Sequence, residues 1–209
     1  MSSFDGRWMR ERLAGHAKAL GAELPEPAGA YDQLATYAGE LVRWNERINL
    51  TGARDVPELV DDHLADALPL LAHLPAGAGA LVDVGSGAGL PGVVLAVLRP
   101  DLDVTLLEPV TKKRHFLAHV IRRLVLARAR ALPERLEDHL EASGAGAYDV
   151  AVARAVWPPA EWLERARPLL RRGGRILGSV AASDLGNLDV QVAPYTLGAR
   201  DRAVVRVDV

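Results

Sequence analysis

The feature that most limits the possible folds of this chain is a glycine-rich segment at residues 85–89, with the sequence GSGAG. The run before it, residues 81–84, has the composition of a short β-strand, and residues 92–98 after it resume as a helix. Glycines at such a junction let the backbone turn sharply and approach a ligand closely. This order predicts an open α/β sheet, in which ligands bind beyond the carboxyl ends of the strands.

The chain after residue 80 repeats this alternation of strand and helix. The predicted strands are 81–84, 103–107, 129–132, 149–153, a fifth beginning at 175–177, 190–195 and 203–207, and the predicted helices between them are 92–98, 111–126 and 158–172. Gly173-Gly174 is expected to cap the last of these helices. The pattern predicts a Rossmann-like fold, with a mostly parallel sheet, helices on both faces and an antiparallel edge hairpin.

The first third of the chain has no such alternation. Helical spacing of apolar residues predicts helices at 5–20, 31–49 and from Pro57 to about residue 73. We therefore expect a helical N-terminal extension over residues 1–75 and a sheet domain over residues 76–209.

Composition excludes several classes of protein. There is no cysteine, so disulfides and thiolate metal sites are impossible, and the six histidines lack the spacing of zinc ligands. The most apolar stretch, residues 80–98, contains Asp83 and Pro91, and the N-terminus is polar. We expect a cytoplasmic protein with no membrane span and no metal. A net charge of −2 does not by itself indicate a nucleic-acid partner.

Two ligand classes are compatible with the glycine loop. Residues 87–92 fit the dinucleotide pattern G-x-G-x-x-G. However, Asp83 lies two residues before the first glycine, where its carboxylate would repel a pyrophosphate held at the nearby helix N-terminus. S-adenosylmethionine (SAM) has no phosphate and carries an ammonium and a sulfonium group, which an anionic strand end attracts. This favours SAM, with a dinucleotide or a ligand-free loop as the alternatives.

Carboxylates after the next two predicted strands suit a nucleoside ligand. Glu108 ends the second strand, where an acid accepts hydrogen bonds from the ribose hydroxyls in sheets of this type. Glu137 and Asp138 follow the third strand. They are expected either to meet the adenine amino group or to be solvated residues at a helix start.

The end of the fourth predicted strand, residues 154–159 with the sequence RAVWPP, bears on the atom that is methylated. Enzymes that methylate exocyclic amino groups usually carry an Asp or Asn before the prolines; none is present here, and no cysteine is available for a thiolate adduct. A nucleophile that loses no proton, such as guanine N7, remains. Arg154 cannot act as a base; we expect it to position the cofactor carboxylate or a substrate phosphate, or else to form a sheet-end ion pair.

Three motifs then identify a resemblance over about residues 40–178. They are WNERINLT at 44–51 followed by HLAD at 63–66; DVGSGAGLPG at 83–92 followed by Leu107-Glu108, Lys112-Lys113 and Phe116-Leu117; and RLED at 135–138 followed by Asp149 and Ala153-Arg154-Ala155. With these motifs the chain resembles the ribosomal small-subunit RNA methyltransferase G family. The resemblance implies SAM-dependent N7 methylation of a guanine in the decoding region of 16S rRNA, with the rRNA or the small subunit as partner and the enzyme as a monomer.

The resemblance and the loop together give two sets of expected site residues. The expected cofactor-binding residues are Asp83, Gly85, Ser86, Gly87, Gly89, Leu90, Glu108, Leu136, Glu137 and Arg154. The expected RNA-binding residues are Lys112, Lys113, Arg114, Arg43, Arg47, Asn45 and Asn49. Three cations at the start of a helix oppose its dipole, so phosphate contact is one reason for their presence, and a solvated face is the other.

Some residues depart from the family pattern or stay ambiguous. A Lys-Gly pair common after the fifth strand is replaced here by residues 177–180, LGSV, and a serine after the HLAD motif by Ala67. His63 and Asp66 share a helix face and form either a substrate-side pair or a buried pair. Two other functions remain open: a small-molecule SAM-dependent methyltransferase, and a protein that binds SAM or a nucleotide without catalysis.

Overall fold

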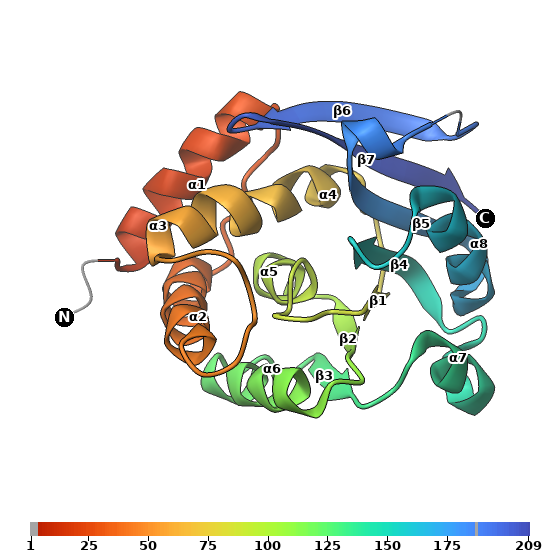
Figure 1. The fold of residues 1–209 in the computed structure, drawn as a ribbon, viewed down its shortest axis with the longest axis horizontal. Coiled ribbons are helices and arrows are strands. Elements are labelled where there is room, and N and C mark those ends of the chain that lie inside the picture. The colour runs from red at the N-terminus through yellow and green to blue at the C-terminus, as the bar shows by residue number, and fades with distance from the viewer. Residues whose placement is uncertain (1–3, 187) are drawn as a thin grey trace.

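The computed structural model describes residues 4–186 and 188–209, and within them the chain forms a seven-stranded sheet in the order β3-β2-β1-β4-β5-β7-β6 (Figure 1). The strands are β1 (Ala80–Val84), β2 (Asp103–Leu107), β3 (Ala129–Leu132), β4 (Tyr148–Arg154), β5 (Leu170–Ala181), β6 (Gln191–Leu197) and β7 (Arg200–Asp208). Strands β1 to β5 pair in parallel, whereas β7 runs antiparallel to β5 and to β6. The predicted Rossmann-like sheet with an antiparallel edge hairpin is confirmed.

Helices cover both faces of the sheet. The helices after β1 are α5 (Gly92–Leu98), α6 (Thr111–Arg123), α7 (Leu136–His139) and α8 (Pro159–Ala166). Figure 1 shows α5 and α6 on one side of the sheet and α7 and α8 on the other. Because successive strand residues point to opposite faces, Leu81 of β1 belongs to the apolar cluster on the first side and Val82 to the cluster on the second.

The N-terminal helices lie on the same side as α5 and α6. They are α1 (Gly6–Leu20), α2 (Ala30–Asn45), α3 (Val56–Leu59), a π-helical turn (Val60–Leu64), a 3-10 turn (Ala65–Ala67) and α4 (Leu68–Ala72). Their buried residues, such as Leu13 and Leu41, belong to one cluster with Val93 of α5 and Phe116 of α6. The helical first third therefore shares a core with the sheet. No helix in the described part of the chain is long and apolar enough to cross a membrane.

Helix α2 ends at Asn45, four residues before its predicted end, because the Asn45 side chain organises the loop that follows. Its amide nitrogen donates to the carbonyl oxygens of Thr51 at 2.8 Å and Ala53 at 3.3 Å, and its oxygen accepts from the backbone of Leu50 and Thr51. Such side-chain bonds to the backbone offer an alternative to helix continuation. They occupy the Asn45 amide, so the predicted RNA contact of Asn45 is replaced by a structural role.

The predicted helix over 158–172 is wrong in its second half. Helix α8 ends at Ala166, a 3-10 turn with Pro168 follows, and β5 begins at Leu170. Pro168 has no amide hydrogen, so it cannot donate to the carbonyl oxygen of residue 164 and continue the α-helix. Gly173, with a φ of 81°, lies in an irregularity of β5, where the pairing with β4 shifts between Tyr148 and Val150. The glycine pair accommodates a bulge in the strand rather than capping a helix.

Candidate functional site

The glycine loop leaves β1 at its carboxyl end and folds back over β2. The backbone amides of Gly85 and Ser86 both donate to the Leu107 carbonyl oxygen at 3.0 Å. Gly85, with a φ of 69°, has the left-handed conformation that favours glycine. A Cβ at this position would lie 2.7 Å from Cγ2 of Val156, so a side chain has no room.

Asp83 lies beneath this loop rather than beside a ligand. It is 1% exposed, and its Oδ2 accepts from the Gly92 amide at 2.9 Å, while the Ser86 hydroxyl donates to the Asp83 carbonyl oxygen at 2.8 Å. Burial raises the pKa of the Asp83 carboxyl to about 7. The prediction that Asp83 contacts the cofactor is corrected: the residue braces the loop and does not line the cavity above it.

Asp83→Asn is expected to change how stability depends on pH. Between about pH 4 and pH 7 the Asp83 carboxyl is ionised in the unfolded chain and protonated in the folded chain. The folded state therefore binds one more proton, and the free energy of unfolding falls as pH rises, by at most about 1.4 kcal/mol per pH unit. The amide mimics the neutral acid and has no such slope. Urea unfolding should show that the free energy of unfolding of the variant increases relative to that of the parent from pH 4 to pH 7. A difference that stays constant with pH would contradict this assignment.

Glu108 closes the other side of the loop. The Gly87 amide donates to its Oε2 at 2.9 Å, and the Val110 amide donates to its Oε1 at 2.8 Å. The side chain is 4% exposed and fixed by these two bonds. A carboxylate has about four acceptor positions, so each Glu108 oxygen keeps capacity for a second hydrogen bond. The residue is thus preorganised to accept from a pair of neighbouring hydroxyl groups.

These groups surround a cavity of about 610 Å³ above the ends of β1, β2 and β4, which we call the main cavity. The predicted residues that line it are Gly85, Ser86, Gly87, Leu90, Glu108, Lys113 and Arg154. Gly89 does not line it. A Cβ on Gly89 would lie 2.5 Å from Val93 Cγ2 and 3.0 Å from Leu117 Cδ2, so this glycine permits close packing of the loop on α5 and α6.

A second hollow of about 490 Å³ continues the main cavity, since both are lined by Gly85, Pro109 and Val156. The predicted residues Leu136 and Glu137 line this part. The Glu137 carboxylate lies 2.7 Å from Nη1 of Arg165. Together the two hollows form one elongated cleft, here called the strand-end cleft, that extends across β1 with Glu108 in its wall.

At the other end of the main cavity, Asp66 is the centre of a polar cluster. It is 2% exposed; its Oδ1 lies 2.6 Å from Nε of Arg202 and accepts from the Tyr195 hydroxyl at 2.7 Å. Its Oδ2 accepts from the Ser179 hydroxyl at 3.2 Å and lies 3.5 Å from Nη1 of Arg154. We call these five residues the Asp66 cluster. A buried carboxylate is stable here because two guanidinium groups and two hydroxyls surround it.

His63 contacts the same arginine as Asp66. Its Nδ1 lies 3.3 Å from Nη1 of Arg154. Burial, with Arg154 as the second cause, lowers the pKa of His63 below its ordinary value. The geometry thus differs from both predicted roles, a substrate-side pair and a buried pair. Each residue instead contacts Arg154 and holds it at the wall of the main cavity.

Ser179, Tyr195 and Arg202 were not predicted as site residues. They come from β5, β6 and β7, and Tyr195 lies 129 residues after Asp66 along the chain. The register pairs Tyr195 with Arg202, and Arg202 with Ala181. These strands carry many other polar and charged residues, so their sequences gave no signal that marks these three.

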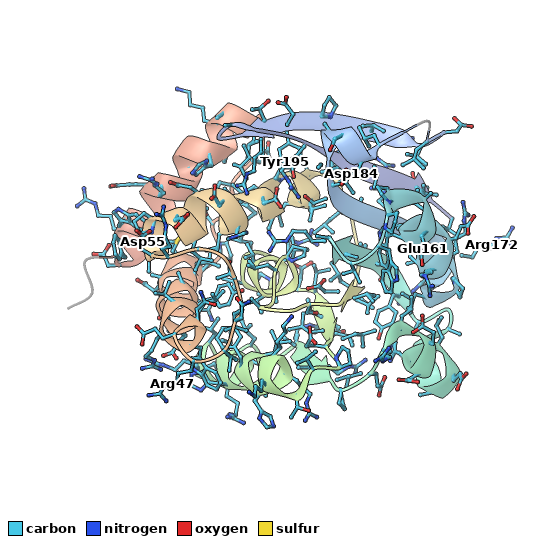
Figure 2. The ribbon with its side chains drawn as sticks, viewed as in Figure 1. Arg47, Asp55, Glu161, Arg172, Asp184 and Tyr195 are labelled. Atoms are coloured by element: carbon cyan, nitrogen blue, oxygen red, sulfur yellow. The ribbon has the colours of Figure 1, made fainter. Side chains whose placement is uncertain are left out.

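The predicted RNA-binding residues lie on α2, on the loop after it and on α6. Lys113 lines the main cavity, and Lys112 is exposed beside it on α6. Arg114 is half-buried. Arg43 is ion-paired with Glu40 and lines a separate hollow with Arg123. Arg47 and Asn49 are exposed, and Figure 2 shows Arg47 at the outer surface. Of these predicted residues, Lys113 is the one that lines the main cavity, and Lys112 precedes it on α6.

Comparison with known proteins gives the family. The model of the family described as GidB, rRNA small subunit methyltransferase G, matches residues 30–204. A protein of Anaeromyxobacter dehalogenans named ribosomal RNA small subunit methyltransferase G is 39% identical over 205 residues, which cover 91% of this chain and 94% of that one.

Solved structures show the same fold at low identity. A methyltransferase from Geobacter sulfurreducens superposes with a TM-score of 0.57 at 14% identity, over 94% of this chain and 96% of that one. The 1,6-didemethyltoxoflavin-N1-methyltransferase of Burkholderia thailandensis, solved with S-adenosylhomocysteine, gives 0.51 at 19% identity, over 90% and 93%. With the family match over most of its length, the chain belongs to the rRNA small subunit methyltransferase G family.

Proposed function

We propose that this protein transfers the methyl group of SAM to N7 of a guanine in the decoding region of 16S rRNA. The observation that carries the proposal is the strand-end cleft with Glu108 fixed in its wall, in a chain of this family. The enzyme then works in the cytoplasm, as a monomer, on the small-subunit RNA or the assembled subunit.

The residues of the cleft fit SAM along its length. Glu108 would accept from both ribose hydroxyls, and the hollow beside Leu136 and Glu137 would take the adenine. At the other end, the Arg154 guanidinium would meet the carboxylate of the methionine part. When bound, SAM supplies an electrophilic methyl group on a sulfonium.

Asp62, Asp66 and His63, which line the main cavity and could otherwise accept a proton, are already engaged, and this supports a target atom that loses no proton. Asp66 accepts from Arg202 and Tyr195, and Asp62 is paired with Arg200. His63 faces a guanidinium donor through Nδ1, so its proton lies on Nε2. Guanine N7 has a free lone pair, and catalysis then rests on positioning and desolvation.

The direct test is transfer of radiolabelled methyl from SAM to small ribosomal subunits, and to naked 16S rRNA, from cells that lack the enzyme. Chemical cleavage specific for N7-methylguanosine maps the product. Label at one decoding-region guanine is expected. If SAM binds and neither RNA is labelled, the function is wrong and a small-molecule substrate becomes the better assignment.

Lys112→Glu combined with Lys113→Glu is expected to weaken RNA binding by about 10-fold or more at moderate salt and to flatten its salt dependence, because two phosphate contacts are lost. SAM affinity should stay within about threefold, since Lys112 is exposed and Lys113 contributes only its side chain to the rim. Filter binding at several salt concentrations measures the first effect and calorimetry the second.

The matched control is Arg167→Glu with Arg172→Glu, which makes the same change in net charge at exposed positions after α8 (Figure 2 shows Arg172 at the far edge of the molecule). This variant should bind RNA as the parent does, apart from a small general loss. Equal losses in the two double variants would show that total charge, and not the α6 end, determines RNA affinity.

A further inference from the structure

A third cavity adjoins the main cavity. Its volume is about 580 Å³, and it lies between the end of β4, the end of β5 and the 3-10 turn Ala182–Asp184; we call it the β5 cavity. Ala155, Val156 and Arg202 line both cavities, and Ala155 with Val156 is here called the shared wall. A ligand in the β5 cavity would therefore lie beside a ligand in the main cavity.

The wall has an unusual backbone. Ala155 has a φ of 54°, in the left-handed region that non-glycine residues rarely adopt, and Val156 after it is 38% exposed. Such strain persists only where the surroundings enforce it, and it is concentrated at ligand sites. The next residue, Trp157, also lines the β5 cavity, and its ring lies parallel to that of Trp162 at 6.0 Å. The cavity thus has a fixed aromatic and aliphatic wall.

Arg202, which lines both cavities, has a donor nitrogen that the described residues leave unused. Its Nε is held by Asp66 at 2.6 Å, and its Nη2 donates to the Ser179 hydroxyl at 2.8 Å. Its Nη1 has no hydrogen-bond partner among the described residues. The buried side-chain atoms without a partner do not include it, so Nη1 is accessible to a ligand. The side chain is 16% exposed. The guanidinium is therefore fixed in place with one free nitrogen.

Asp184 supplies an acceptor in the same cavity. It is exposed at the end of the 3-10 turn and is labelled in Figure 2. Its Oδ1 accepts from the Ser183 hydroxyl at 3.0 Å. Asp184 lines the β5 cavity and is not part of the main cavity lining, unlike Arg202. Donor and acceptor are thus ordered along the cavity, with the donor nearer the shared wall.

We propose that the β5 cavity receives the target guanine, with Arg202 donating to O6 and Asp184 accepting from N1–H and the 2-amino group. This inference rests on the proposed function. In guanine, N7 and O6 are neighbours on one edge, and N1–H and the 2-amino group lie on the other. With N7 directed over the Ala155–Val156 wall, O6 falls beside Arg202, and the donor edge extends toward Asp184. Adenine presents an acceptor at N1 and no 2-amino group, so a carboxylate there rejects it.

The charge balance of the reaction also suits an acid at this position. The bond from N7 to the methyl carbon forms as the carbon–sulfur bond breaks, and the electron pair of that bond stays on sulfur. Positive charge moves from sulfur to the guanine ring, and no proton leaves. The N1–H becomes a stronger donor as the charge arrives, so its hydrogen bond to a carboxylate strengthens in the transition state.

Asp184→Asn tests this assignment at an exposed position where folding is not at stake. We expect methyl transfer to small subunits to fall about 10- to 100-fold in kcat/KM, the size of a lost charge-assisted hydrogen bond pair. SAM affinity by calorimetry should match that of the parent. Asp189→Asn is the matched control: it removes an exposed carboxylate from the same segment at a residue that lines neither cavity, and it should transfer as the parent does.

Subunits reconstituted with inosine at the mapped guanosine make the test specific for the base edge. Inosine lacks the 2-amino group, so the loss caused by Asp184→Asn should be smaller on inosine than on guanosine. An equal loss on both substrates would overturn the contact to the 2-amino group.

The outcomes separate this inference from the function on which it rests. If the parent methylates the subunit and Asp184→Asn does so equally well, the β5 cavity is not the base site and the proposed function stands. If the parent binds SAM and labels no rRNA, the function fails, and the base site fails with it.

Discussion

Glu108→Ala should raise the dissociation constant for SAM by about 100-fold or more. The carboxylate is held by the Gly87 and Val110 amides, and the substitution removes both of these bonds with the acceptors for two ribose hydroxyls. Two hydrogen bonds to a charged group are together worth about 3 kcal/mol, which corresponds to that factor. Isothermal titration calorimetry measures the constant directly.

Asp103→Ala is the control for this result, because Asp103 lies at the opposite end of the same strand and is exposed, with Arg128 as its partner. It should bind SAM as the parent does. A Glu108→Ala variant that stays folded by circular dichroism and binds SAM within threefold of the parent would remove Glu108 from the cofactor site.

Asp66→Ala is expected to lower the free energy of unfolding by about 3–5 kcal/mol, because it leaves the guanidinium groups of Arg154 and Arg202 facing each other without a counterion. The hydroxyl of Tyr195 also loses its acceptor. Burial raises the pKa of this hydroxyl to about 12, so it keeps its proton at neutral pH and remains a donor. Urea unfolding at neutral pH gives the value.

The neighbouring acid Asp62 provides the comparison. It is 40% exposed and paired with Arg200, so Asp62→Ala should cost less than about 1 kcal/mol. Similar losses for the two variants would mean that Asp66 is no more important to stability than a surface ion pair.

Features encoded locally were predictable from the sequence. The glycine loop and Glu108 lie where the alternation of strands and helices put them, because both are fixed by residues within a few positions or on the adjacent strand. The edge hairpin was predictable for the same reason, since its turn and its two strands are consecutive.

Features that depend on distant partners were not predictable. Asp83 was predicted as an anionic strand end in contact with the cofactor, yet it is buried beneath the loop and accepts from the Gly92 amide. Asn45 was assigned to RNA because nothing in its own helix shows that it organises the next loop. The Asp66 cluster joins residues from five elements, and no spacing along the chain encodes that meeting.

The order in which these segments are made by the ribosome has a consequence for when the enzyme becomes competent. A nascent chain folded only through β5 already has Glu108, the glycine loop and Arg154, so it holds the parts that we assign to SAM. Tyr195 and Arg202 arrive later, with the hairpin that docks on β5. On the proposed assignments, the residues for SAM are therefore all synthesised before Arg202, the residue assigned to guanine O6.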